Sequence, residues 1–348
     1  MAELWRIAID VMGGDTGPSV TVPASLSALR RYGYLSLVLV GDSSLIEPYL
    51  TNLSSDERDR IQIVHTSDVV SNQSRPDSIL RSGRQSSMFK AVELVQTGDV
   101  QACVSAGNTG ALLMAGRHLL KNIPGIEKPA IMAVVPASSS SSNTFLLDVG
   151  ANTWCSASQL FQFALMGSVL VTAMSGREKP RVALLNIGEE EYKGRPEIRE
   201  AAALLAASNA MEYLGFVEGN QLFDGRSDVI VCDGFTGNVV IKVIAGSVRV
   251  TQNLVQQSLR KRWYYRFFAW WLQPLMRDVR RTLKPSRYNG AMLLGLQGIV
   301  VKSHGNADRS GFERAIEYAL RQVQDDVPGV IASRMAALTG LAEEAKPV

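Results

Sequence analysis

The sequence repeats one pattern along most of its length. A short apolar run ends in glycine and polar residues, and a stretch with apolar residues at helical spacing follows. Apolar runs that end at glycine are typical of buried strands, and strands alternating with helices are typical of βαβ units. We therefore expect an α/β fold with a mainly parallel sheet. The expected strands are Trp5–Val11, Leu35–Val40, Ile61–His65, Ala102–Ser105, Ala130–Val135, Phe145–Gly150, Val182–Leu185 and Val229–Cys232, with a further apolar run at Leu293–Lys302. The expected helices are Thr21–Tyr32, Met88–Gly98, Ala111–Leu120, Leu160–Met174, Pro196–Leu214, Phe312–Val323 and one beginning at Val239–Ser247.

Five of these runs end in loops that combine glycine with amides, hydroxyls, carboxylates or a lysine. They are Gly13–Asp15, Ser105–Gly110, Gly150–Asn152, Asn186–Gly194 and Asp233–Asn238. Open parallel sheets bind their ligands beyond the carboxyl ends of the strands, so we expect the five loops to converge on one edge. Such groups suit the positioning and electrostatic stabilisation of an anion better than covalent catalysis.

The segment Arg181–Gly194, RVALLNIGEEEYKG, shows the pattern most fully. An apolar run breaks at Asn186 into three successive glutamates, and Lys193 follows. The glutamates also suit the amino end of a following helix. A lysine beside three carboxylates and two glycines predicts a site, and the alternative is a solvated charged loop.

Two further loops have the form of anion-binding turns. Gly13 and Gly14 follow a strand and let the backbone approach an anion, although a tight structural turn explains them equally well. The stretch Ala106–Gly110 lies between a strand and a helix, an arrangement that aims backbone N–H groups at a phosphate. Asn108 and Thr109 could donate to phosphate oxygens or cap the helix, and the two roles are compatible.

Composition excludes several classes of protein. A formal net charge of +3 over 348 residues does not by itself imply a nucleic-acid partner. The three cysteines form no close pair, and the three histidines are scattered, so we expect no disulfide framework, no metal site and no cofactor. The amino-terminal stretch lacks the apolar core of a signal peptide, and no apolar run reaches the roughly 18–20 residues of a spanning helix. We expect a protein of the reducing cytoplasm.

The segment Leu254–Leu283 departs from this pattern. With Lys284 it holds eight basic residues against one acid, Asp278, and three of the five tryptophans. The apolar run Trp263–Leu272 is too short to span a bilayer and suits an interface with anionic lipid. We therefore predict peripheral membrane binding; a buried subunit interface and a single-stranded nucleic-acid site are the alternatives. The expected membrane-binding residues are Arg262, Trp263, Phe267, Phe268, Trp270 and Trp271.

Six motifs together resemble one family. They are IDVMGGD, SAGNTGALL, LDVGAN, LLNIGEEEYKG, CDGFTGNV and KSHG, and their order and spacing resemble the bacterial phosphate acyltransferases of the PlsX type from about residue 6 to about residue 330. The resemblance implies a three-layer α/β/α fold like that of the isocitrate and isopropylmalate dehydrogenases, with a protruding amphipathic helical segment. It also implies one domain over residues 1–335, with an insertion at 251–287, and a tail at 336–348.

The resemblance further implies an activity and its partners. The expected reaction transfers a fatty acyl group from acyl carrier protein to inorganic phosphate, giving acyl phosphate for phospholipid synthesis. The expected partners are acyl carrier protein, phosphate, a second copy in a homodimer, an anionic membrane surface and the membrane glycerol-3-phosphate acyltransferase that uses acyl phosphate, with no nucleic acid. The expected location is the cytoplasm, at the inner face of the membrane.

The motifs assign expected roles to individual residues. Lys193 would neutralise charge on phosphate or on the oxyanion, and Asn238 would donate its amide to the acyl carbonyl. The remaining expected substrate contacts are Asp10, Gly13, Gly14, Asp15, Ser105, Gly107, Asn108, Thr109, Gly110, Asn152, Asn186, Glu189, Asp233, Thr236, Gly237 and His304. The sequence departs from the family pattern at Trp154, where an acidic residue is expected.

Three rival functions are consistent with parts of the sequence. The first is a phosphotransacetylase-like enzyme that uses acyl-CoA. The second is a dehydrogenase of the related fold, which would need a dinucleotide fingerprint that the sequence lacks. The third is a non-catalytic membrane scaffold, which leaves the polar loops unexplained.

Overall fold

The computed structural model describes residues 4–136, 143–260 and 290–344. Its strands are β1 Trp5–Asp10, β2 Leu35–Gly41, β3 Ile61–His65, β4 Ala102–Ser105, β5 Ala130–Pro136, β6 Asn143–Leu147, β7 Arg181–Leu185, β8 Glu212–Val217, β9 Val229–Val231, β10 Ala291–Leu294 and β11 Ile299–Lys302. Its longer helices are α1 Pro18–Arg31, α5 Ser87–Gln96, α6 Thr109–Leu120, α7 Ala157–Ser175, α8 Pro196–Ala206, α9 Gly234–Arg260, α12 Arg309–Gln324 and α13 Val327–Glu344. Short helical turns are α2 Ser43–Ile46, η1 Glu47–Tyr49, α3 Ser55–Asp59, α4 Ser78–Arg81 and η2 Gly219–Phe223.

The strands form one sheet in the order β3-β2-β1-β4-β11-β10-β5-β6-β9-β7-β8. The first strand block, β3, β2, β1, β4 and β11, is parallel throughout. The second strand block, β6, β9, β7 and β8, is also parallel throughout. Between them, β10 pairs antiparallel with both β11 and β5, and β5 pairs antiparallel with β6. The prediction of a mainly parallel sheet is confirmed, but the two blocks run in opposite directions.

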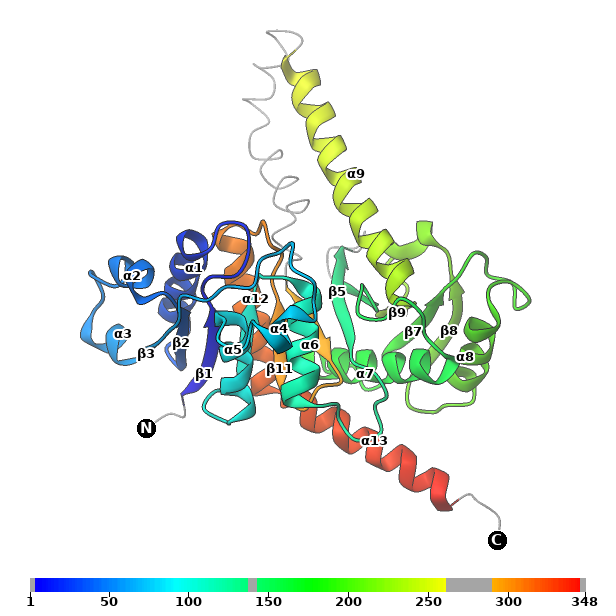
Figure 1. Ribbon diagram of the computed structural model, residues 1–348. Coiled ribbons are helices and arrows are strands. Elements are labelled where there is room, and N and C mark those ends of the chain that lie inside the picture. The colour runs from blue at the N-terminus through cyan, green and yellow to red at the C-terminus, as the bar shows by residue number, and fades with distance from the viewer. Residues whose placement is uncertain (1–3, 137–142, 261–289, 345–348) are drawn as a thin grey trace.

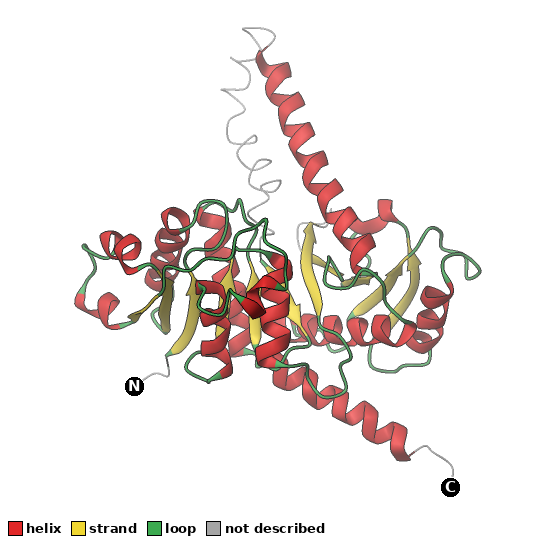
Figure 2. Cartoon of the chain, viewed as in Figure 1, coloured by secondary structure: helices red, strands yellow, loops and turns green. Residues whose placement is uncertain are grey.

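Helices cover both faces of the sheet, which makes the expected three layers (Figure 2). Ile7 and Ile9 of β1 lie in one core with residues of α1, α7 and α12, whereas Ala8 between them lies in a second core with residues of α5 and α6. This division follows from the period of two along a strand, which sends successive side chains to opposite faces. Helix α9 stands out from the body beyond its first turns (Figure 1).

Local sequence signals explain where the helices begin and end. Asn108 caps α6 by accepting a hydrogen bond from the Ala111 N–H. Ser156 and Gln159 form a capping box at the start of α7, and Gly176, in the left-handed conformation, ends that helix. These caps fix where the helices begin and end next to the loops that carry the candidate site.

Several expected boundaries are wrong. The expected helix Pro196–Leu214 ends at Ala206, and β8 begins at Glu212. The run Leu293–Lys302 is two antiparallel strands, β10 and β11, rather than one. The expected loop Asp233–Asn238 is mostly the first turn of α9, which begins at Gly234. The domain division stays a prediction; residue 336, where the expected tail begins, lies within α13, which continues to Glu344.

Helix α7 is long and apolar enough to cross a membrane by length and composition alone, a feature that the sequence analysis overlooked. However, 67% of its most apolar window is buried inside the fold. Residues of α7 lie in the main core together with those of β7, β9 and α8. It is therefore a mostly buried helix of the fold, and among the described residues it is the one candidate span.

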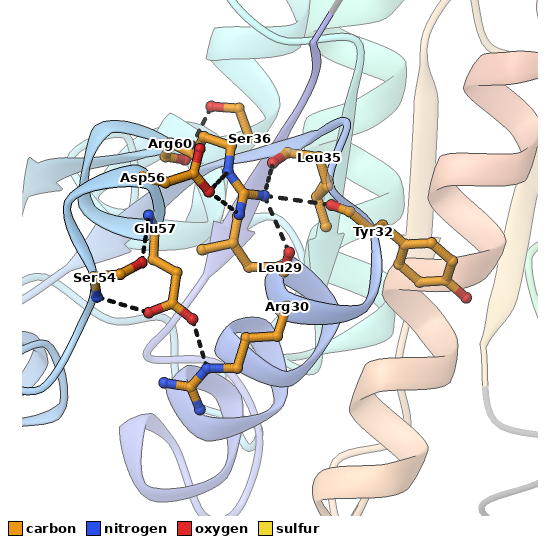
Figure 3. A network of polar contacts seen from close by, with 9 residues as sticks. All are labelled: Leu29, Arg30, Tyr32, Leu35, Ser36, Ser54, Asp56, Glu57 and Arg60. Atoms are coloured by element: carbon orange, nitrogen blue, oxygen red, sulfur yellow. Dashed lines mark hydrogen bonds and ion pairs between the residues drawn. The ribbon is translucent and has the colours of Figure 1, made fainter.

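Arg60 joins three elements at one end of the first strand block (Figure 3). Its Nη1 donates to the carbonyls of Leu29 at 3.0 Å and Leu35 at 3.1 Å, and its Nη2 donates to Asp56 Oδ2 at 2.8 Å. The residue is 8% exposed, so these carbonyls have little access to water when the guanidinium is removed.

We expect Arg60→Met to lower the free energy of unfolding by about 3 kcal/mol, because the charged hydrogen bonds are lost and the buried carbonyls are left without a donor. Urea denaturation measures this change. The neighbouring Arg30, whose ion pair with Glu57 is exposed on the arginine side (51%), is the matched control. Arg30→Met should cost much less, because exposed ion pairs contribute little to stability, and equal losses in the two variants would contradict the assignment.

Candidate active site

The predicted site residues fall into two groups, because the two strand blocks run in opposite directions. Strands β1, β4 and β11 end at one edge of the sheet, and β6, β7 and β9 end at the other. The prediction that all five loops converge on one edge is therefore wrong. The first-block group contains Asp10, Gly13, Gly14, Asp15, Ser105, Gly107, Asn108, Thr109, Gly110 and His304. The second-block group contains Asn152, Asn186, Glu189, Lys193, Asp233, Thr236, Gly237 and Asn238.

A buried carboxylate, Asp10, organises the first-block group. Its two oxygens accept hydrogen bonds from Ser87 Oγ and Ser105 Oγ, each at 2.6 Å. Burial raises the pKa of Asp10, and the serine hydrogen bonds oppose the shift. A Cβ on Gly13 would lie 2.5 Å from Asp10 Oδ2 and 2.8 Å from the Gly107 nitrogen, so only glycine allows these loops to approach one another.

Many polar groups of the first-block loops are used within the fold. The Gly107 N–H donates to Ser105 Oγ at 3.1 Å. The Asn108 amide donates to the carbonyls of Asn72 and Ser74 at 3.1 and 3.0 Å, while its oxygen caps α6. Asn108 therefore fulfils the capping role that the sequence predicted as one of two. This group holds the loops of the first block together.

Sequence reasoning missed Lys302, which lies inside the KSHG motif. The residue is 8% exposed, and its Nζ donates to the carbonyls of Ala106, at 3.2 Å, and Ser303. Burial lowers the pKa of Lys302 to about 8, although Asp10 and Asp15 oppose the shift. The motif marked the position, but only the fold shows that the ammonium is buried.

This pKa predicts a rise in stability at alkaline pH. Because the folded-state pKa of about 8 lies below the ordinary 10.5, the unfolded chain binds the proton more tightly between these values. The free energy of unfolding should therefore rise by about 3 kcal/mol from pH 7 to pH 10.5, relative to Lys302→Met, since one pKa unit corresponds to about 1.4 kcal/mol. Urea unfolding of both proteins at the two pH values measures the difference, and identical pH dependence would contradict the assignment.

In the second-block group, the loop after β6 is organised by Asp148, which sequence reasoning did not include among the site residues. Its Oδ1 accepts hydrogen bonds from the N–H groups of Ile131, Gly150 and Ala151, at 2.9–3.1 Å. Its Oδ2 accepts two from the backbone and side chain of Asn152, at 2.8 and 2.9 Å. Burial raises the pKa of Asp148, and these donors oppose the shift. Asn152 is thus a structural partner of Asp148.

The first turn of α9 lies directly on this loop. A Cβ on Gly237 would lie 1.8 Å from the Asp148 carbonyl oxygen, and one on Gly234 would lie 2.6 Å from the Asn152 carbonyl oxygen. Asp233 caps the turn, because its Oδ1 accepts a hydrogen bond from the Thr236 N–H at 2.8 Å. The half-buried Asn238 lies over Gly150, where an added Cβ would lie 3.7 Å from the Asn238 Cβ.

Lys193 lies in the loop after β7. Its Nζ is 3.0 Å from Glu190 Oε2, and its side chain is 36% exposed. A Cβ on Gly188 would lie 2.4 Å from Lys193 Cδ, so the lysine side chain crosses over the bare glycine. The Asn186 amide donates to the Lys193 carbonyl at 3.1 Å. Asn186 Oδ1 is one of four buried side-chain oxygens of the described residues that have no hydrogen-bond partner.

Arg195, which sequence reasoning also missed, connects the Lys193 loop to α9. Its Nη2 donates to Asp233 Oδ2, and the carboxylate is 4% exposed. Lys193 therefore lies two residues before Arg195, whose partner Asp233 caps the helix that carries Asn238. Glu189 points elsewhere and accepts a hydrogen bond from Gln221 of η2. The loop and the helix give this edge a cation, an amide and the positive end of a long helix dipole.

The predicted membrane-binding residues, Trp154 and His304 do not belong to the second-block group. The predicted membrane-binding residues Arg262, Trp263, Phe267, Phe268, Trp270 and Trp271 lie outside the described residues. Trp154, where an acid was expected, is 53% exposed, and Lys128 lies 6.0 Å from its ring centroid. His304 is exposed and follows Lys302 in the first-block group.

The amino-acid sequence is similar to curated proteins over nearly its whole length. A family model described as "Fatty acid synthesis protein" matches residues 5–329. The chain is 47% identical to the phosphate acyltransferases of Shewanella sediminis and of Shewanella woodyi, over 95% of this chain and 97% of each of those proteins.

Solved structures show the same fold at low sequence identity. A phosphotransacetylase from Streptococcus pyogenes superposes with a TM-score of 0.63 at 15% identity, covering 93% of this chain and 95% of that one. A branched-chain phosphotransacylase from Enterococcus faecalis gives a TM-score of 0.57 at 17% identity, covering 92% and 99%. The sequence relatives, rather than these structures, decide the family. The chain belongs to the fatty acid synthesis protein family, is a phosphate acyltransferase of the PlsX type by its relatives, and is therefore an acyltransferase.

Proposed function

We propose that this enzyme transfers a fatty acyl group from acyl carrier protein to inorganic phosphate and so supplies acyl phosphate for phospholipid synthesis. Family membership supports acyl transfer to phosphate. The carrier-protein donor and the pathway are our inference. The observation that carries the assignment to a site is the ion pair Arg195–Asp233, which joins the loop of Lys193 to the helix of Asn238.

In the proposed reaction, a phosphate oxygen attacks the thioester carbonyl carbon. A tetrahedral oxyanion forms, the C–S bond then breaks, and the carrier leaves as a thiolate, which becomes a thiol by taking up the proton that hydrogen phosphate loses. Lys193 offsets the negative charge of phosphate and oxyanion, and Asn238 donates its amide to the developing oxyanion.

The cysteines beside the site support direct attack by phosphate rather than an acyl-enzyme. Cys155 and Cys232 are buried. Burial raises the pKa of Cys155 to about 12 and that of Cys232 well above its ordinary value. A thiol acts as a nucleophile through its thiolate, which is scarce near neutral pH at such pKa values. Phosphate is itself a competent nucleophile near neutral pH, so the reaction needs no general base.

A thiol-release assay with two donors tests the proposal. Palmitoyl-acyl carrier protein should release its thiol only when phosphate is added, and the product should be acyl phosphate. Palmitoyl-CoA at the same concentration should react at least about tenfold more slowly. Faster reaction with the CoA thioester would favour the phosphotransacetylase-like alternative, and cleavage without phosphate would contradict acyl transfer to phosphate.

We also propose that the enzyme works in the cytoplasm as a homodimer at the membrane surface, close to the glycerol-3-phosphate acyltransferase that consumes acyl phosphate. Composition supports the membrane part, since residues 254–283 combine basic and aromatic side chains.

Flotation with liposomes checks the membrane proposal. The full chain should float with vesicles that contain anionic phospholipid and remain at the bottom with neutral ones. Deletion of Trp263–Trp271 should abolish flotation. Undiminished flotation of the deletion variant would contradict the assignment.

A further inference from the structure

We propose that Arg195 is a positioning residue of the reaction. Its ion pair with Asp233 holds the loop that carries Lys193 against the amino end of the helix that carries Asn238. The role rests on the proposed function, because it concerns the two residues to which that function assigns the chemistry. Sequence motifs did not single out Arg195, and its role emerges only from the fold.

The ion pair joins a half-exposed guanidinium to a buried carboxylate. The Arg195 side chain is 50% exposed and that of Asp233 is 4% exposed. Both Asp233 oxygens are engaged, one by Arg195 and the other by the Thr236 N–H of the first helical turn. Loss of the guanidinium would leave a buried carboxylate without its charged partner, and this cost favours the paired arrangement.

The Lys193 loop has few other anchors. Ile187 is 78% exposed and Tyr192 is 72% exposed, so the loop buries few apolar side chains. The Asn186–Lys193 and Lys193–Glu190 contacts lie within the loop, and Glu189 is tied to Gln221 of η2. Among the hydrogen bonds and ion pairs of the described residues, Arg195–Asp233 is the contact that connects this loop to α9.

The opposite ends of the same strands provide a matched control. Arg177, just before β7, pairs with Asp228, just before β9, at 3.4 Å. The two side chains are 48% and 8% exposed, close to the values of the Arg195–Asp233 pair. Asp228 also pairs with Arg181, at 2.9 Å. Arg177→Gln therefore removes a similarly exposed guanidinium at the edge of the sheet away from Lys193, and it leaves the carboxylate with its closer cation.

Hydrogen exchange of the full-length protein tests the positioning role without reference to activity. Arg195→Gln should speed amide exchange by about tenfold or more in residues 186–195 and in the first turn of α9, because the contact between them is lost. Arg177→Gln should leave both segments unchanged. Unchanged exchange in Arg195→Gln would overturn the proposal, whether or not the enzyme cleaves acyl-carrier protein thioesters.

Steady-state kinetics separates positioning from direct binding. For Arg195→Gln we expect kcat to fall about tenfold with the KM for phosphate within about threefold of wild type, since misplaced catalytic groups lower turnover. Arg195→Lys should recover part of kcat, and Arg177→Gln should equal wild type. Asp233→Asn should reproduce the loss, and combining it with Arg195→Gln should add little.

A raised KM for phosphate with unchanged kcat would overturn positioning in favour of direct phosphate binding. A wild-type enzyme without phosphate-dependent activity would instead refute the proposed function, and the exchange result would still decide the role of the ion pair.

Discussion

Lys193→Ala should lower kcat for phosphate-dependent thioester cleavage by about 10²–10³-fold, the usual effect of removing one group that stabilises an oxyanion. Two negative charges meet in the proposed transition state, one from phosphate and one on the carbonyl oxygen. The Lys193 ammonium is partly exposed, and among the described residues its ion pair is with the exposed Glu190. The ammonium can therefore turn toward a substrate by giving up one solvent-accessible ion pair, which costs little.

Thiol release from acyl-carrier protein at saturating phosphate measures this effect. Lys179, exposed at the amino end of β7, is the matched control, since it lies at the other end of the same strand. Lys179→Ala should retain wild-type kcat, and the thermal midpoints of both variants should stay close to wild type. If Lys193→Ala kept more than about a tenth of the activity, Lys193 would not take part in the mechanism.

Asn238→Ala should lower kcat by about 10²-fold, because an amide donor to the oxyanion is lost while the helix remains. Asn238 lies in the first turns of α9, whose position is fixed by close contacts of Gly234 and Gly237 with the Asp148–Asn152 loop. A donor on such a rigid element needs no rearrangement when charge develops on the carbonyl oxygen. Its effect should therefore appear in kcat more than in the KM for either substrate.

The same helix supplies the control for this prediction. Asn253 is exposed on α9, 15 residues beyond Asn238 and hence about 22 Å farther along the helix axis. Asn253→Ala should leave kcat and KM unchanged. A loss of activity in Asn253→Ala as large as that in Asn238→Ala would show that the effect comes from the helix rather than from the amide.

Apolar runs predicted most of the fold, because buried strands of a parallel block are apolar on both faces. Strand β4 was predicted at its observed bounds, Ala102–Ser105. Strand β8 was missed because it is the last strand of the sheet and its residues are partly exposed, so no continuous apolar run marks it. The opposite direction of the second block was missed for another reason: an apolar run does not reveal which way its strand points.

The motifs named the candidate site residues one by one, but they did not show that these residues fall into two groups at opposite edges of the sheet. Lys193 and Asn238 were identified from motifs, and the structure connects their elements through Arg195 and Asp233. Arg195 and Lys302 were missed because their partners, Asp233 and Ala106, are distant in sequence. Glycines such as Gly13 and Gly107 allow close approach between loops, and their predicted contact with phosphate stays a prediction.

A double-mutant cycle between Lys193 and Asn238 tests the central claim most directly, because two groups that act on one oxyanion do not contribute independently. We predict that Lys193→Ala combined with Asn238→Ala loses no more than about threefold beyond the larger single loss in kcat. If the two losses multiply in full, the lysine and the amide act independently, and one shared reaction centre at the carboxyl ends of β7 and β9 is contradicted.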